Sequence, residues 1–202
     1  MYDYDMYWFD DDYHMTCDNP APWFATLQMI QDHPVTSLVI QDGVTSIGES
    51  AFVYAKLTEV TIPGSVESIG YSAFGSMKTL QKVTLEEGVQ SIGTMAFLQC
   101  EALEKLKLPS TLTEIGSNAF SGCSKLEELE LPDGITMISS FAFNACSSLK
   151  EVAIPGSVQS MGMHAFGNCT SLDKVTIWKG VWQVDWYVFT GDTALKTVVI
   201  PI

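Results

Sequence analysis

The 202-residue chain contains no arginine: all ten of its basic residues are lysines, against 24 aspartates and glutamates, and its formal net charge at pH 7 is −14. Such a chain repels nucleic-acid phosphates and anionic lipids, and it lacks arginine, the side chain best suited to bind either of them. We therefore expect no binding to nucleic acid and none to a membrane surface.

Long apolar runs are missing as well. No stretch approaches the roughly 18 residues needed to span a bilayer, and the chain does not open with a basic segment followed by an apolar one. It is nevertheless 47% hydrophobic and only 17% charged, which excludes intrinsic disorder. Because it starts in an aromatic and acidic stretch and stops within a repeated pattern, we expect a segment of a longer protein, with signal and anchor outside this chain.

Catalytic signatures are equally scarce. No Ser, Asp or Cys stands in recognisable motif relation to His14, His33 or His164. A phosphate-binding loop, a dinucleotide fingerprint and a zinc-protease motif are also missing. We expect a protein that is not an enzyme and uses no cofactor.

What the chain does contain is an internal repeat with a period of 23 residues. Ala-Phe, or Val-Phe in the last copy, recurs at Ala51, Ala73, Ala96, Ala119, Ala142, Ala165 and Val188. A second marker, an aliphatic residue followed by proline, runs in step from Ile62-Pro63 to Ile200-Pro201. A unit this short cannot bury its own apolar face, so the units must stack into a solenoid.

One unit illustrates the local structure that we expect. Leu106 and Leu108 alternate with Lys105 and Lys107, which is the period of a short strand, and Pro109 ends that strand. The glycine that follows isoleucine in most units predicts a positive φ and then a short helical turn carrying Ala-Phe. The predicted fold class is an α/β repeat solenoid, with parallel strands on the concave side, short helical turns and second short strands elsewhere.

The segments Leu57–Pro63 and Val66–Phe74 carry a family resemblance. They are similar to the BspA-like leucine-rich repeats of bacterial and protozoan surface proteins, over residues 35–202 and about seven repeats. Residues 1–34 resemble the end of that family's N-terminal cap, with its opening strands missing. The resemblance implies a secreted or cell-surface leucine-rich repeat protein that acts in adhesion or protein binding rather than in catalysis.

Cysteines recur at the repeat spacing, at Cys100, Cys123, Cys146 and Cys169. Metal sites use paired ligands two to four residues apart, whereas single thiols one coil apart form a ladder inside the core. Met77 and Asp192 occupy the same position in other units, and Met77 favours packing. We expect neither a disulfide framework nor a metal site, and Cys17, outside the repeats, is a candidate reactive thiol.

The N-terminal segment mixes acidic and aromatic side chains. Its aspartates are suited to calcium but lack the spacing and glycine of an EF-hand loop: Asp3, Asp5, Asp10, Asp11, Asp12 and Asp18. His14 and Cys17 form half of a zinc site without a second pair. We favour a solvated cap whose aromatic residues cover the open end of the first coil.

The outward side chains of the predicted strands are the leading candidate site. The strands should stack as eight rungs, led by Val39, Val60, Val83, Leu106, Leu129, Val152, Val175 and Val198. The candidate binding residues beside them are Glu59, Thr61, Lys82, Thr84, Lys105, Lys107, Glu128, Glu130, Glu151, Lys174 and Thr176.

Two interpretations of these outward columns stay open. Opposite charges on neighbouring rungs predict ion pairs, at Glu59/Lys82, Lys105/Glu128, Lys107/Glu130 and Glu151/Lys174. In the first interpretation, such pairs only avoid repulsion on a solvated face. Alternatively, the face is a concave docking surface, as solenoids present to proteins and glycans.

The last complete unit departs from the repeat through its aromatic residues: Trp178, Trp182, Trp186 and Tyr187. They either cap the end of the core or form a binding patch, since exposed Trp and Tyr anchor protein partners and stack on sugars.

The sequence therefore predicts a monomeric, non-catalytic protein-binding or adhesion module whose partner is a host or neighbouring-cell surface protein. A carbohydrate-binding role of the aromatic patch and a structural spacer role are the alternatives. Exposed tryptophans would favour binding, and paired charges with little exposed apolar surface would favour the spacer.

Overall fold

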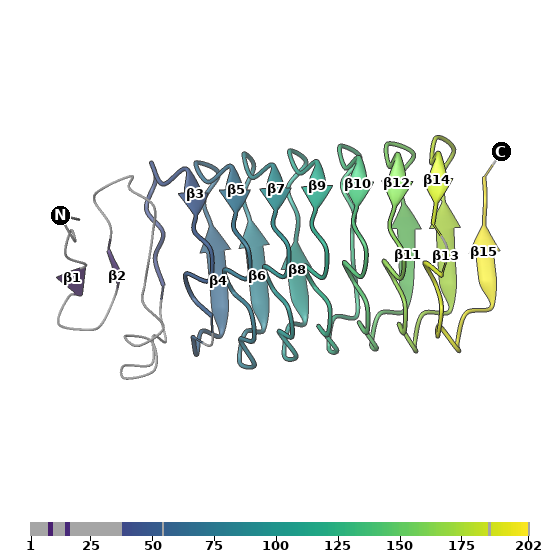
Figure 1. Cartoon of the computed structure of the whole chain (residues 1–202), viewed down its shortest axis with the longest axis horizontal. Helices are drawn as coiled ribbons and strands as arrows, with labels where there is room; N and C mark the ends of the chain where they lie inside the picture. The colour runs from purple at the N-terminus through teal and green to yellow at the C-terminus, as the bar shows by residue number, and fades with distance from the viewer. Residues whose placement is uncertain (1–7, 10–14, 17–37, 54, 186, 202) are drawn as a thin grey trace.

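The computed structural model describes residues 8–9, 15–16, 38–53, 55–185 and 187–201. From residue 38 onward the chain winds into coils that stack side by side along the long axis (Figure 1). The predicted cap, residues 1–34, lies outside the described residues except for β1 (Trp8–Phe9), which pairs antiparallel with β2 (Met15–Thr16).

Each coil contributes one short strand to a continuous parallel sheet of seven strands, in the order β14-β12-β10-β9-β7-β5-β3. The strands are β3 (Ser46–Ile47), β5 (Ser68–Ile69), β7 (Ser91–Ile92), β9 (Glu114–Ile115), β10 (Met137–Ile138), β12 (Ser160–Met161) and β14 (Gln183–Val184). In the first six the second residue is buried, so this side chain anchors the sheet to the core. The expectation of second short strands is confirmed.

A second set of strands forms the opposite side of each coil, which we call the strand face. It comprises β4 (Glu59–Ile62), β6 (Lys82–Leu85), β8 (Lys105–Lys107), β11 (Glu151–Ile154), β13 (Lys174–Ile177) and β15 (Thr197–Val199). The register places Glu59 beside Lys82 and Glu151 beside Lys174, as the repeat predicts.

The predicted eight-rung sheet is wrong in two places. Residues 128–131 form no strand, so the strand face consists of two three-stranded sheets, β4-β6-β8 and β11-β13-β15. Val39 also lies outside any strand. One side of the rod is therefore a continuous sheet, whereas the other is interrupted at one coil.

The core is built around a column of stacked phenylalanine rings. Successive ring centroids lie 5.2–5.9 Å apart, through Phe52, Phe74, Phe97, Phe120, Phe143, Phe166 and Phe189. The rings are parallel to within 19°. Five of the seven are fully buried, so each coil gains its apolar burial only by contact with its neighbours.

The predicted cysteine ladder is confirmed, because all four repeat cysteines are buried and free. Each thiol donates a hydrogen bond to a phenylalanine carbonyl of the preceding coil; Cys123 Sγ, for example, lies 3.5 Å from the carbonyl oxygen of Phe97. Burial raises the pKa of Cys100 and of Cys146 to about 12. The thiolate, which is the reactive form, is therefore suppressed.

The predicted helical turns are wrong, because the described residues contain no helix and the α/β description is not confirmed. The residue before each Ala-Phe has a positive φ, for example 60° at Met95. That conformation stops a right-handed helix from propagating. The backbone amides bond to the next coil instead, as Phe97 N–H does to the Ala119 carbonyl at 2.8 Å.

The glycine after isoleucine serves close packing rather than a positive φ. Gly93 is not among the residues of positive φ, but a Cβ on it would lie 2.6 Å from the carbonyl oxygen of Ile69. A side chain at this position would push neighbouring coils apart.

Replacing Phe120 by alanine should reduce the free energy of unfolding by about 3–5 kcal/mol, because it leaves a cavity in the middle of the ring column. Urea titration followed by circular dichroism measures the change. Phe120→Leu, which fills most of the cavity, should lose clearly less; equal losses would contradict a role for ring packing.

The four ladder thiols should resist a thiol reagent such as Ellman's reagent until the protein unfolds. In a Cys17→Ser background we expect no fast-reacting thiol in buffer and four equivalents in denaturant. Fast modification of the native protein would show that the ladder is open to solvent.

Candidate interaction face

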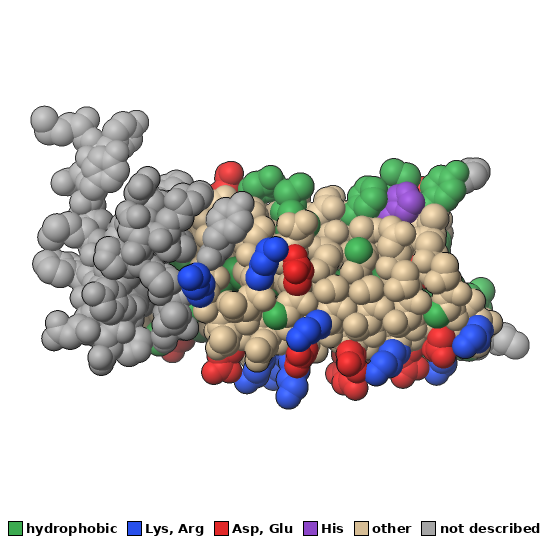
Figure 2. All heavy atoms as spheres, turned by 90° about the horizontal axis from the view of Figure 1, so that it is seen from below, with side chains coloured by type: hydrophobic (Ala, Val, Ile, Leu, Met, Phe, Trp, Pro, Cys, Tyr) green, Lys and Arg blue, Asp and Glu red, His purple; other side chains and the backbone are tan. Residues whose placement is uncertain are grey.

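The strand face presents the predicted binding residues as two parallel columns along the rod. Nine of the eleven are exposed, and only Thr84 and Thr176 are half-buried. Nine lie on strands whose register the structure defines, and Glu128 and Glu130 lie in the interrupted coil. Figure 2 shows lysine and acidic side chains gathered along one long edge of the rod.

Two of the four predicted ion pairs are present. Lys82 Nζ lies 3.6 Å from a carboxylate oxygen of Glu59, and Lys174 Nζ lies 3.2 Å from Glu151. Within the described residues, neither Lys105 nor Lys107 has a carboxylate within 4.0 Å, so the pairs predicted with Glu128 and Glu130 do not form. Their rungs do not pair as strands, which removes the register on which the prediction rested.

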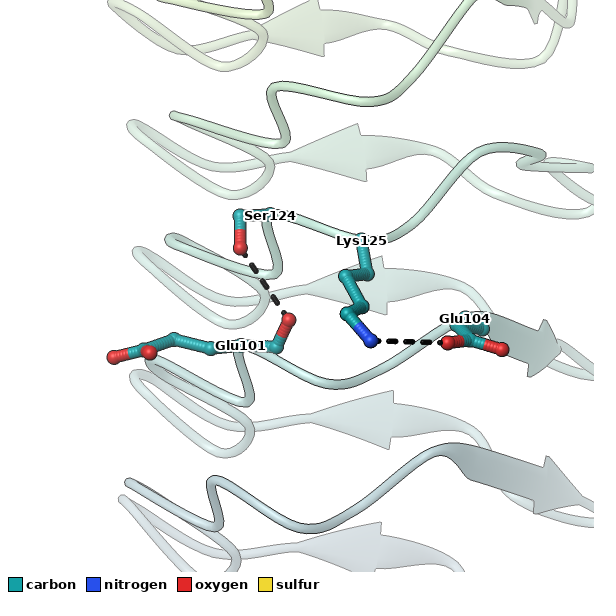
Figure 3. A network of polar contacts seen from close by, with 4 residues as sticks. All are labelled: Glu101, Glu104, Ser124 and Lys125. Atoms are coloured by element: carbon teal, nitrogen blue, oxygen red, sulfur yellow. Dashed lines mark hydrogen bonds and ion pairs between the residues drawn. The ribbon is translucent and has the colours of Figure 1, made fainter.

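Three further ion pairs bridge neighbouring coils beside the columns. Lys125 reaches back to Glu104 at 3.3 Å (Figure 3), and Lys150 reaches Glu127 at 2.6 Å. The third joins Lys78 to Glu101 at 3.4 Å. The hydrogen bond and charge of Lys150 lower the pKa of the Glu127 carboxyl. All these side chains are exposed, so the pairs contribute little to stability.

A hollow of about 520 Å³ opens at the interrupted coil, and we call it the notch. Its lining consists of Glu104, Lys105, Lys125, Glu127, Glu128 and Ser148. In the rungs around it, Leu106, Leu108 and Leu131 are only partly buried. Equivalent residues elsewhere, such as Ile62 and Leu85, are fully buried. The coils thus fit less tightly here than at β4 and β6.

Charges of the same sign recur one repeat apart at this coil, although Lys82 and Lys105 do the same within the intact pair of β6 and β8. Glu127 follows Glu104, and Glu151 follows Glu128, at the repeat spacing of 23 residues. Like charges directly opposite each other destabilise a pair of neighbouring strands. Sequence reasoning did not single out Glu104, Lys125, Glu127 or Ser148, although this charge repetition was visible in the alignment of the units.

Two of the four residues of the predicted aromatic patch are exposed tryptophans that lie at different places in the last coil. Trp178 is 51% exposed after β13 and Trp182 is 89% exposed before β14, and no ring contact joins these two described residues. Trp186 lies outside the described residues. Tyr187 lies after β14, at the next corner of the coil.

Tyr187 belongs to a second, external ring stack that sequence reasoning missed. It stacks on His164 at 5.7 Å between centroids, and His164 stacks on Phe141 at 5.0 Å. All three precede an Ala-Phe or Val-Phe dipeptide, and that position was the available signal. The histidine and its hydrophobic neighbours lie on the edge of the rod opposite the charged columns (Figure 2).

In the last coil Val184 is 46% exposed and Val198 is 52% exposed, whereas the equivalent residues one coil earlier, Met161 and Val175, are buried. That the aromatic residues of this coil cap the core stays a prediction.

Within the described residues, no group of three His, Cys, Asp or Glu side chains could hold a metal ion. The calcium and zinc candidates of the N-terminal segment, including His14 and Cys17, lie outside the described residues, as does His33. The described part of the chain also contains no helix of the length and apolarity needed to cross a membrane.

Comparison with known families identifies the repeat. Residues 29–124 and 90–202 match the BspA type leucine-rich repeat region, in six copies. The chain therefore belongs to this family of leucine-rich repeat proteins, as the sequence predicts.

Solved structures of bacterial leucine-rich repeat proteins share the fold. A leucine-rich cell surface protein of Faecalibacterium prausnitzii is 27% identical, with a TM-score of 0.60, and the match covers 82% of this chain and 54% of that one. A leucine-rich repeat protein of T. pallidum is also 27% identical, with a TM-score of 0.66 and coverages of 76% and 73%. No curated protein matches. The chain thus spans about half the length of the F. prausnitzii protein.

Asp192 occupies the cysteine position of the last coil and is the one strongly perturbed carboxyl among the described residues. One carboxylate oxygen accepts the Cys169 N–H at 2.7 Å, while the other is buried without a hydrogen-bond partner. Burial raises the pKa of this carboxyl to about 7. Between pH 4 and 7 the folded chain therefore keeps a proton that the unfolded chain has lost.

Because the folded chain binds this proton more tightly than the unfolded chain does, the free energy of unfolding should fall as the pH rises from about 4 to about 7. Above pH 7 it should fall no further on account of Asp192. The variant Asp192→Cys restores the ladder residue and removes this titration. The gain in melting temperature of the variant over the parent should be small at pH 4.5 and largest at pH 8. A gain that does not change with pH would contradict the raised pKa.

Proposed function

We propose that this chain is a non-catalytic recognition module of a secreted or cell-surface protein and that it binds a protein partner through the strand face. The carrying observation is the array of exposed side chains on two three-stranded sheets, β4-β6-β8 and β11-β13-β15, each with a defined strand register. A rigid array of this kind pays little ordering entropy on binding. The F. prausnitzii relative, described as a cell surface protein, supports the proposed location.

Carbohydrate binding at the last coil is the second candidate. Trp182 is almost fully exposed and Trp178 half exposed, and an indole ring held out to solvent is suited to stacking on a sugar ring. A spacer role is less well supported, because Trp178 and Trp182 are exposed.

A binding screen against extracellular-matrix proteins and a glycan array tests both candidates. In Thr61→Arg/Ala153→Arg, two bulky cations project from exposed positions of the strand face. In the matched control, Gln90→Arg/Gln159→Arg, the same change is made at exposed positions just before β7 and β12. Protein binding should weaken by about tenfold or more in the first variant and stay unchanged in the control.

Glycan binding that is lost in Trp182→Ala, with the strand-face variant unaffected, would establish the carbohydrate role instead. Equal binding by both arginine variants, or no binding on either panel by the folded chain, would contradict recognition through the strand face.

A further inference from the structure

The notch contains two unpaired charges of opposite sign. Lys105 and Glu128 both line it, and neither takes part in an ion pair within 4.0 Å among the described residues, although the charge of Glu128 contributes to raising the pKa of Lys150. The other charges of the lining are engaged, since Glu104 pairs with Lys125 and Glu127 with Lys150. Lys105 and Glu128 occupy the same column one repeat apart, where an intact ladder would have placed them side by side.

The backbone around these charges is also left open. β8 pairs only with β6, and β11 pairs only with β13, so two sheet edges face the interrupted coil. An extended segment can pair with an open strand edge, and its charged side chains can then reach Lys105 and Glu128.

We propose that the notch is the specificity pocket of the strand face and receives a protein segment with an arginine and a carboxylate side by side. The arginine lies against Glu128 and the carboxylate against Lys105. Arginine fits better than lysine because its planar guanidinium donates to a carboxylate and to backbone carbonyls together.

This inference rests on the proposed function and specifies its partner. In an extended segment, residues two apart project to the same side, so an arginine and a glutamate separated by one residue present both charges to the notch. The probe is a peptide with blocked ends that consists of threonine except for one arginine and one glutamate, which are separated by a single threonine. Its matched control carries the neutral citrulline in place of arginine.

A double-mutant cycle on the full chain tests the contact. Glu128→Gln should weaken binding of the arginine peptide by about fivefold, and citrulline should weaken binding to the parent chain similarly. The two changes together should cost no more than either alone, because they remove the same contact. Glu67→Gln makes the same change of charge just before β5 and should alter affinity by less than about twofold at physiological salt.

Ser148→Trp provides an independent variant, since it fills the notch and leaves every charge in place; it should abolish binding while the melting temperature is preserved. Amide chemical-shift changes on titration should map to residues 104–106, 127–131 and 148. The proposal would be overturned if the affinity losses in the cycle were additive, or if Glu67→Gln weakened binding as much as Glu128→Gln. Chemical-shift changes outside these residues, or no binding at millimolar peptide, would also overturn it. If Thr61→Arg/Ala153→Arg still blocks a protein partner while Glu128→Gln does not, the notch proposal alone fails.

Discussion

Contact between successive coils is the constraint on which the rest of the structure depends. One phenylalanine ring per coil stacks on the next at 5.2–5.9 Å, and inter-coil backbone bonds such as Phe97 N–H to Ala119 C=O run in parallel. A single coil has no apolar interior of its own, so its stability comes from two neighbours. The same contact sets the positions of the outward columns, because side chains one period apart are placed side by side.

The period made much of this structure predictable. Since equivalent residues of neighbouring units must touch, the sequence alone placed Cys123 between two other cysteines and Lys82 beside Glu59, and both predictions are confirmed. The family, in contrast, follows from the resemblance carried by Leu57–Pro63 and Val66–Phe74. The reasoning from the period works because each of these two placements depends on which residue type occupies a position in adjacent units.

Features that depend on backbone conformation or on the balance between competing contacts were not predictable in this way. A positive φ is usually signalled by glycine, but Met95 and Phe141 adopt it because inter-coil hydrogen bonds fix the corner. The interrupted rung has the same Leu-Glu-Leu alternation as a strand, around Leu129 and Leu131. Nothing in this alternation distinguishes residues 128–131 from the rungs that form strands, so the break was not predictable from it.

The interrupted rung also gives the rod an uneven mechanical stiffness. On one side the seven-stranded sheet runs through every coil without a break; on the other, the strand ladder is missing between β8 and β11. A bending load therefore meets two hydrogen-bonded layers along most of the length but only one at this coil. The rod flexes there first, about the continuous sheet as a spine, and the strand face is the side that opens or closes when it does.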